Sequence, residues 1–235
     1  MNFRITHINP TMNSNLKNSK DRAFTRIELA AIIAILALLT LILLPALAQD
    51  SQNSARRQCV NNLMQVGLAF KTWAVDNGDK FPMAVSNRLG GTLEFAVDGN
   101  AFRHFQVMSN ELTTPKILVC PADTRKPRSQ VEGQPAQVFG DLQNKNISYF
   151  VGLDASDSKP MMFLSGDRNI TNGVAPVQTV LELRPRIPAG WTRTMHINQG
   201  NVGLADGSIQ TYSTPRLQQA LQYTEDSTNR IALPE

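Results

Sequence analysis

The sequence has few of the residues from which enzyme active sites and metal sites are usually built. It holds Cys 2 and His 3 in 235 residues, and it contains no Gly-rich phosphate loop and no HExxH, GxSxG or CxxC motif. Two cysteines allow one disulfide but no metal cluster by themselves. These absences argue against the common nucleotide-binding, hydrolytic and metal-dependent enzymes, so we expect no catalytic residues and no enzyme activity.

Charge is also sparse, at 18% of residues, and it is unevenly placed. The formal net charge is +4, but about three of these charges precede residue 24, in Arg4, Lys17, Lys20 and Arg22 against Asp21. The remainder of the chain is nearly neutral. We therefore expect no nucleic-acid partner, because such partners usually require a basic surface.

One long apolar run stands out against this background. From Ile27 to Ala48 the chain reads IELAAIIAILALLTLILLPALA, with Glu28 as its only charge. About 20 helical residues at about 1.5 Å each cover a hydrocarbon core of about 30 Å. The basic residues precede the run, and positively charged flanks stay on the cytoplasmic side of a membrane. We therefore expect residues 1–23 to form a cytoplasmic leader and the C-terminal part to cross the membrane. We expect a single-pass inner-membrane protein whose residues 24–48 contact lipid.

Two processing sites are compatible with this N-terminus. Ala46-Leu47-Ala48 has the small-x-small form of a signal peptidase site, which would release a secreted periplasmic or cell-surface binding module, for example one for polysaccharide. The apolar run is longer than the about 7–15 residues usual for such a signal. The boundary Ala23-Phe24-Thr25-Arg26-Ile27-Glu28 instead resembles the prepilin signal, whose peptidase cuts before the apolar helix and leaves it on the mature protein.

The resemblance to pilins and type II secretion pseudopilins assigns roles to several residues. It implies cleavage between Ala23 and Phe24, N-methylation of Phe24, and pairing of Glu28 with the N-terminal amine of a neighbouring subunit. Pro45 matches the helix-kinking proline of many pilins. Placing a carboxylate such as that of Glu28 in a membrane-spanning helix costs free energy, so such residues usually have a function. The chain departs from the family by having Ala23 where Gly is usual and Arg26 where Leu is usual. The implied partners are other pilin-like subunits, the prepilin peptidase and inner-membrane lipid.

Beyond the apolar run, the pattern predicts that the helix continues through residues 49–80. Apolar residues recur every three or four positions, at Ala55, Cys59, Leu63, Val66, Phe70 and Trp73. Asp76-Asn77-Gly78-Asp79 then supplies a helix stop, and Pro82 follows it. We predict one helix from about Phe24 to Asp76.

Residues 81–235 are interrupted about every 8 to 12 residues by Gly, Pro, Asn or Asp, with short β-rich runs between the breaks. The runs are Ile117–Val119, Ile147–Val151, Met161–Leu164, Val177–Leu183, Val202–Ala205 and Ser208–Tyr212. Such spacing is typical of a small antiparallel sheet. The predicted fold class is therefore α+β, with a pilin-like arrangement of a long N-terminal helix packed on an antiparallel sheet domain.

The strongest internal motif joins His196 to Asp206-Gly207 in the segment HINQGNVGLADG. It resembles the H-x9-DG segment of a prepilin-associated domain of planctomycete and verrucomicrobial pseudopilins, and similar agreement covers Cys120–Asp123, Ser148–Ala155 and Gly166–Asn169. This family forms structural subunits of type II secretion or type IV pilus-like filaments. From the residues alone, His196 and Asp206 either fix the register of a hairpin or form a metal or catalytic pair. Without a nucleophile motif nearby, the structural interpretation is favoured.

If the domain is exported, two further features are expected, a calcium site and a disulfide. Some type II pseudopilins bind calcium, and Asp154, Asp157 and Asp167 could supply oxygen ligands, but they form no EF-hand pattern and solvated turns are the favoured explanation. Cys59 and Cys120 would form a disulfide in an oxidising compartment, worth on the order of 4 kcal/mol for a loop of about 60 residues. Two buried free thiols are the alternative.

Overall fold

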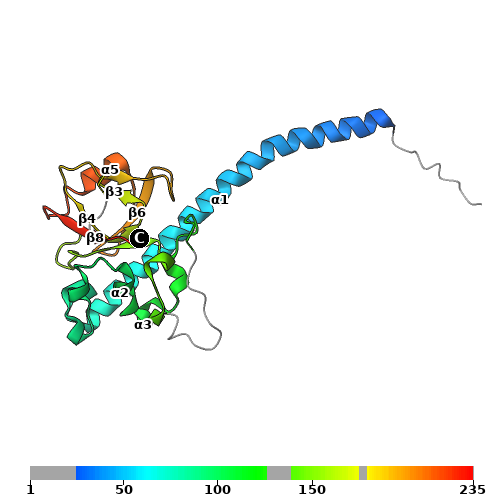
Figure 1. Cartoon of the computed structure of the whole chain (residues 1–235). Coiled ribbons are helices and arrows are strands. Elements are labelled where there is room, and N and C mark those ends of the chain that lie inside the picture. Colours follow the sequence, from blue (N-terminus) through cyan, green and yellow to red (C-terminus); the bar gives the residue numbers. More distant parts are fainter. Residues whose placement is uncertain (1–24, 126–138, 175–178, 235) are drawn as a thin grey trace, which may run out of the picture. The chain divides into compact units, whose positions relative to one another are not determined.

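The computed structural model describes residues 25–125, 139–174 and 179–234, without the side chains of residues 42–51. The chain divides into two compact units, Met1–Leu47 and Ala48–Glu235. Figure 1 shows the elements of each unit. The predicted cleavage residues Ala23 and Phe24 lie outside the described residues, and Pro45 lies among those whose side chains are not described.

Helix α1 runs from Arg26 to Asp76. It begins with a capping box, in which Thr25 Oγ1 accepts a hydrogen bond from the Glu28 backbone N–H (3.3 Å) and Glu28 Oε2 accepts one from the Thr25 backbone N–H (2.8 Å). The helix ends where the sequence predicted a stop, because Gly78 (φ 67°) and Asp79 (φ 58°) adopt a left-handed backbone conformation.

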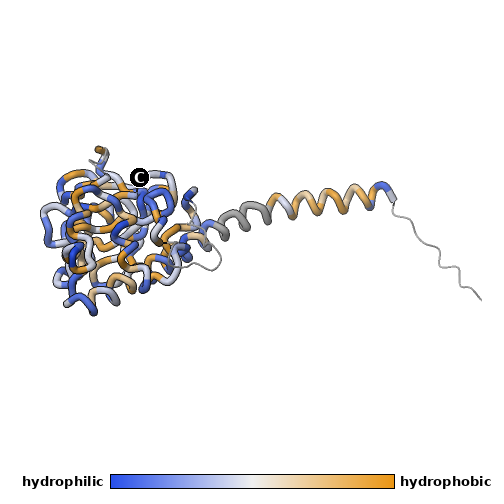
Figure 2. The backbone as a smooth tube through the Cα atoms, turned by 60° about the horizontal axis from the view of Figure 1, so that its bottom comes forward, coloured by the Kyte–Doolittle hydropathy of each residue, from blue (hydrophilic) through white to orange (hydrophobic). Residues whose placement is uncertain are grey.

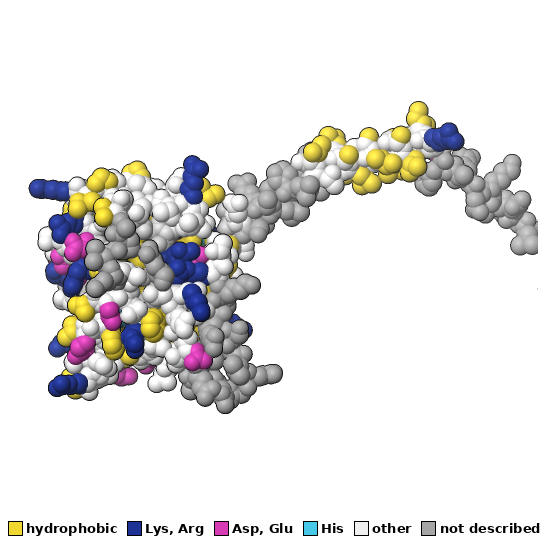
Figure 3. Space-filling model, in the orientation of Figure 1, with side chains coloured by type: hydrophobic (Ala, Val, Ile, Leu, Met, Phe, Trp, Pro, Cys, Tyr) yellow, Lys and Arg dark blue, Asp and Glu magenta, His cyan; other side chains and the backbone are white. Residues whose placement is uncertain are grey.

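The described side chains at the start of α1 are exposed and mostly apolar. Ile27 is 80% exposed and Leu41 is 73% exposed, and the apolar residues between them are exposed as well. Figure 2 shows this run as a nearly continuous hydrophobic stretch, and Figure 3 shows apolar side chains on the helix surface. The sequence predicts a membrane-spanning segment here. Within the described part of the chain, however, no helix is both long enough and apolar enough to cross a membrane.

The second unit contains a six-stranded antiparallel sheet with the strand order β4-β8-β1-β2-β6-β7. Its strands are β1 (Tyr149–Gly152), β2 (Phe163–Asp167), β4 (Val180–Leu183), β6 (Gln199–Leu204), β7 (Ile209–Ser213) and β8 (Asn229–Ala232). A two-stranded sheet joins β3 (Ile170–Thr171) to β5 (Gly190–Trp191). The predicted α+β class and antiparallel sheet are confirmed.

Short helices complete the second unit. The α-helices are α2 (Ala101–Gln106), α3 (Ser109–Leu112) and α5 (Thr214–Ala220), and the 3-10 helices are η1 (Pro82–Ala84), η2 (Asn87–Leu89), η3 (Leu93–Phe95), η4 (Pro115–Leu118) and η5 (Asn144–Asn146). The predicted strand Ile117–Val119 is wrong, because most of it belongs to η4. Pro115 occupies the first turn there, and Thr114 Oγ1 accepts a hydrogen bond from the Lys116 backbone N–H.

The main sheet has a buried core on each face. On one face, α1 contributes the buried side chains predicted from its periodicity, namely Cys59, Leu63, Val66, Phe70 and Trp73. They share this core with Tyr149, Val151 and Leu164 of the sheet. The opposite face packs against Trp191 of β5 and Leu217 of α5. The central strands β1 and β2 are thus buried on both sides, so a polar side chain there needs a specific partner.

Candidate metal centre

Four side chains with metal-ligand atoms meet in the second unit, between α1 and the sheet. They are Cys59, Cys120, Asp167 and His196; their ligand atoms all lie within 4.8 Å of one another, and all four residues are buried. Within the described ranges, this is the one such group of three or more. The sequence singled out each of the four residues but assigned them to three different sites.

The position of Asp167 depends on an irregularity in β2. Phe163 belongs to the core on the α5 side and Leu164 to the core on the α1 side. Strict alternation would place Asp167 on the same face as Phe163. The register between β2 and β6 shifts between Phe163 and Ser165, which reverses the faces of the residues that follow. Asp167 therefore faces α1.

A row of polar side chains crosses the α1-facing side of the sheet at this level. Asn201 of β6 donates two hydrogen bonds to Asp167 Oδ2, from its backbone N–H (2.7 Å) and from Nδ2 (2.9 Å). Thr211 of β7 donates to Asn201 Oδ1 (2.7 Å). Cys59 lies over the row, with Sγ 3.1 Å from Asp167 Oδ1 and 3.4 Å from the Tyr149 hydroxyl. The buried carboxylate is thus satisfied from the sheet and from the helix.

Cys120 follows η4 and is held by contacts on both sides of it in the chain. Before it, the Val119 carbonyl accepts a hydrogen bond from Asn62 Nδ2 of α1 (3.0 Å). After it, Asp123 forms a bidentate pair with Arg168, with distances of 2.7 and 2.8 Å. Arg168 directly follows Asp167, so this pair also anchors the Cys120 loop beside the carboxylate.

His196 enters the cluster from the loop before β6. Its Nε2 lies 3.3 Å from Cys120 Sγ and 3.5 Å from Asp167 Oδ2. Ile197 (φ 41°) and Asn198 (φ 59°) form a tight bend after it, and β6 starts at Gln199. Gly200 pairs with Tyr212 within β6, and the position requires glycine because a Cβ there would come within 2.3 Å of the Trp191 ring.

Contrary to the sequence prediction, His196 does not pair with Asp206 but lies beside Asp167. Asp206 is exposed, and its Oδ1 accepts a hydrogen bond from the Ser208 backbone N–H (2.8 Å) within the β6–β7 turn. Gly207 has φ 91°, and its N–H donates to the Leu204 carbonyl (2.9 Å). Asp206 and Gly207 thus form the turn, while the carboxylate beside His196 is that of Asp167.

Cys59 and Cys120 are close, as predicted, but they are free thiols and the predicted disulfide is not formed. Besides their mutual contact, Cys59 approaches Asp167 and Tyr149, and Cys120 approaches His196. These contacts hold each sulfur in place within the cluster.

The electrostatics of the cluster differ from one group to the next. Burial raises the pKa of Cys59, whereas the hydrogen bond from Cys59 lowers the pKa of Cys120 to about 6, with a further contribution from His196. Burial raises the pKa of Asp167. Burial opposes protonation of His196, but the bond to Cys120 and the charge of Asp167 outweigh it and raise the pKa. The contact between them therefore favours the thiolate form of Cys120 and the protonated form of His196.

The cluster does not have the geometry of a nucleophilic triad. In such a triad the nucleophile and the carboxylate contact different nitrogens of the histidine. Here Cys120 and Asp167 both approach Nε2 of His196, and all three side chains are buried. Two sulfurs, one imidazole nitrogen and one carboxylate are instead a set that could hold a metal ion.

The predicted calcium ligands do not come together in the structure. Asp154 is paired with Arg230, which donates from its backbone N–H (2.8 Å) and from Nε (3.0 Å). Asp157 forms an ion pair with Lys71 of α1. With these two carboxylates bound to cationic side chains and Asp167 in the buried cluster, the three do not form one oxygen site.

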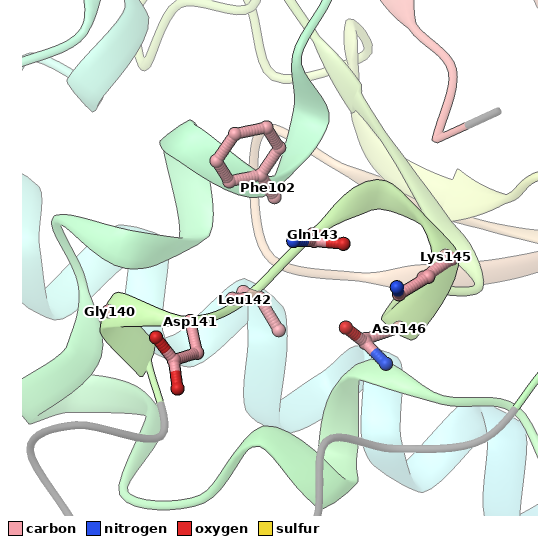
Figure 4. Close-up of a pocket in the computed structure, with 7 residues that line it drawn as sticks. All are labelled: Phe102, Gly140, Asp141, Leu142, Gln143, Lys145 and Asn146. Atoms are coloured by element: carbon pink, nitrogen blue, oxygen red, sulfur yellow. The ribbon is translucent and has the colours of Figure 1, made fainter.

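Two surface pockets lie near this part of the second unit. One, of about 300 Å³, is lined by Phe102 of α2 and residues of the 140–146 loop, and Figure 4 shows Asp141 and Lys145 at opposite ends of it. Its lining brings no set of catalytic groups together. The other, of about 350 Å³, is lined by Cys120, Asn62 and Asp123 among others, so it reaches the edge of the cluster.

No protein-family model, curated protein or solved structure matches this chain.

Proposed function

We propose that the chain is a pilin-like structural subunit, a pseudopilin of a type II secretion or type IV pilus-like filament. The observation that carries this proposal is the contrast between the two parts of α1. From Cys59 to Trp73 the helix is built into the core of the sheet domain, whereas from Ile27 to Leu41 its apolar side chains are exposed. An apolar surface of this extent requires a partner, because its exposure to water costs about 25 cal/mol per Å².

In the proposal, two partners cover this surface in succession. Before assembly the precursor lies in the inner membrane as a single-pass protein, with the sheet domain in the periplasm. In the filament, the same helices of neighbouring subunits replace the lipid. The continuity of α1 supports retention of the apolar segment, because the bond between Ala48 and Gln49 lies inside a helix and would need local unfolding before a signal peptidase could cut it.

Glu28 is suited to a role in assembly. It lies in the first turn of α1, and both hydrogen bonds from Thr25 use its Oε2 atom. In the proposal, Oε1 accepts a bond from the new amine of Phe24 on a neighbouring subunit, after a prepilin peptidase has cut between Ala23 and Phe24. The action of the subunit is then mechanical. The buried cluster around Asp167 stabilises the folded sheet domain and takes no part in catalysis.

The N-terminal residue of the mature protein tests this proposal. The full chain is expressed in a host that has a prepilin peptidase, extracted from the membrane fraction, and analysed by N-terminal sequencing and intact mass. We expect Phe24 at the N-terminus, carrying an N-methyl group. An N-terminus at Gln49 in a soluble periplasmic fraction would overturn the proposal and support the secreted binding module.

A further inference from the structure

We propose that Cys59, Cys120, Asp167 and His196 bind one zinc ion in a closed structural site. The site joins four separate segments of the second unit: α1, the loop after η4, strand β2 and the loop before β6. This inference rests on the geometry of the cluster and is independent of the assignment to a filament.

Three distances in the cluster are close to those of a tetrahedral site. Zinc bonds of about 2.3 Å to sulfur and about 2.0–2.1 Å to nitrogen or oxygen place neighbouring ligand atoms about 3.3–3.8 Å apart. The observed separations are 3.1 Å for Cys59 Sγ to Asp167 Oδ1, 3.3 Å for Cys120 Sγ to His196 Nε2 and 3.5 Å for His196 Nε2 to Asp167 Oδ2. All four ligand atoms lie within 4.8 Å of one another, and the two Asp167 distances involve different carboxylate oxygens. The longest separations therefore have to shorten by about 1 Å for all four atoms to coordinate one ion.

The ligand types select the class of metal. Thiolate and imidazole ligands favour zinc over calcium and magnesium, which take mainly oxygen ligands. Four protein ligands leave no open position, which is typical of structural rather than catalytic zinc. The ion would also balance the negative charge of Asp167, which is fully buried.

The surroundings of the cluster orient its ligands. Asn201 donates two hydrogen bonds to Asp167, and the hydroxyl of Tyr149 contacts Cys59 Sγ. Such outer contacts fix ligand geometry in metal sites. The pocket lined by Cys120 and Asn62 borders the cluster on the side of the Cys120 loop.

A disulfide between the same cysteines is the competing state. It would bring the two sulfurs to about 2.05 Å and draw Cys59 away from its contacts with Asp167 and Tyr149. The buried carboxylate and imidazole would then keep their positions with fewer partners, which is unfavourable. Zinc uses all four side chains where they already lie.

The test uses the full chain in mild detergent, purified with a reductant and without a chelator. Elemental analysis is expected to give one zinc per chain. Removing the metal with a chelator should lower the midpoint of thermal unfolding, and adding zinc alone should restore it, whereas calcium alone should not. Cobalt in place of zinc should give thiolate-to-cobalt charge-transfer absorption.

Variants distinguish the site from adventitious binding. Cys120→Ser and His196→Gln should each weaken zinc binding about tenfold or more, and Tyr149→Phe should weaken it less. The matched control is Asp206→Asn, which alters the acidic residue of the HINQGNVGLADG segment outside the cluster and should keep full zinc content.

Two results would overturn the inference. One is a wild-type chain with two free thiols that takes up no zinc when zinc is added. The other is a mass lower by two hydrogens with Cys59 joined to Cys120 in protein recovered from its native compartment. If a variant does not fold, the zinc titration and the cobalt spectrum of the wild-type chain still decide the question. Neither result depends on whether the mature chain begins at Phe24.

Discussion

At the scale of single residues, buried polar contacts of the sheet fix how the strands and loops pack against α1. Asp167 is completely buried, yet it accepts hydrogen bonds from Asn201 and Cys59. Beside it, Arg168 reaches the carboxylate of Asp123, whose side chain is 0% exposed. Because an unpaired buried charge is far more costly than a paired one, these contacts specify one arrangement of loop and strand.

The Asp123–Arg168 pair leads to a prediction of pH-dependent stability. Burial acts to raise the pKa of Asp123, but the bonds from Arg168 and Ser148 outweigh burial and lower it. A carboxyl group with a lowered pKa in the folded state stabilises the protein above its unfolded pKa of about 3.9, and this contribution is lost as pH falls through the folded pKa. Asp123→Asn should lower the free energy of unfolding at pH 7 by about 2–3 kcal/mol.

Urea unfolding at a series of pH values from 7 downward measures this effect. The wild-type chain should lose more stability than the Asp123→Asn variant below about pH 4, because only the wild type loses this carboxylate. Glu182→Gln is the matched control, since its pair with Arg184 is 48% exposed on both sides and should change stability by less than about 0.5 kcal/mol. Parallel pH curves for wild type and Asp123→Asn would contradict the assignment.

The sequence identified the residues of the cluster better than it identified their partners. Cys59, Cys120, His196 and Asp167 were all singled out, and the closeness of the two cysteines was predicted. The pairing of His196 with Asp167 could not be predicted, because it depends on the register shift in β2 that turns Asp167 toward α1. No residue pattern near Phe163 signals that shift, whereas the Asp206-Gly207 turn has a strong local signal.

At the scale of elements, local patterns predicted some features well and others poorly. The spacing of apolar residues along α1 predicted its buried face, and Asn77-Gly78 predicted its end. The strand predicted at Ile117–Val119 became a 3-10 helix because Pro115 fixes the first turn. Helix α5 and strand β8 were missed, since their short runs acquire order mainly from packing on the sheet.

The capping box of α1 allows the proposed assembly role of Glu28 to be separated from its local role. Glu28→Gln keeps an oxygen that can accept the bonds from Thr25 but removes the charge, whereas Thr25→Ala removes the cap and keeps the charge. If the carboxylate pairs with a neighbouring amine, Glu28→Gln should reduce filament incorporation about tenfold or more, through loss of a charge-assisted bond. Thr25→Ala should cost about 1 kcal/mol of helix stability and leave incorporation nearly unchanged.

Quantifying the subunit in sheared filaments, relative to its amount in the membrane, provides the measurement for both variants. Equal losses in Glu28→Gln and Thr25→Ala would show that the cap, and not the charge, is what assembly requires. Normal incorporation of Glu28→Gln would remove the proposed role of the carboxylate altogether.

At the scale of the whole molecule, the two units differ in where their apolar side chains are placed. In the described part of the chain, the first residue that belongs to either buried core is Cys59. The apolar residues from Ile27 to Leu41 contribute exposed surface instead. The stability of the sheet domain should therefore be independent of the first unit, and assembly should depend on it.

A chain that begins at Ala48 tests this separation. Its free energy of unfolding, measured by urea denaturation in the same detergent as the full chain, should lie within about 1 kcal/mol of the full-length value, because none of the removed side chains that the structure describes is buried. A chain that begins at Met64 is the matched control. It lacks Cys59 and Leu63, which are 0% and 1% exposed, and should lose about 4 kcal/mol or more.

The same truncation separates folding from filament formation. The chain that begins at Ala48 should fold and yet be absent from filaments, because it lacks the apolar surface that neighbouring subunits are proposed to cover. A loss of more than about 2 kcal/mol in this chain would mean that residues before Ala48 support the sheet domain directly. Its incorporation into filaments at the full-length level would instead show that the sheet domain carries the assembly contacts, and the exposed apolar residues of α1 would then need a different partner.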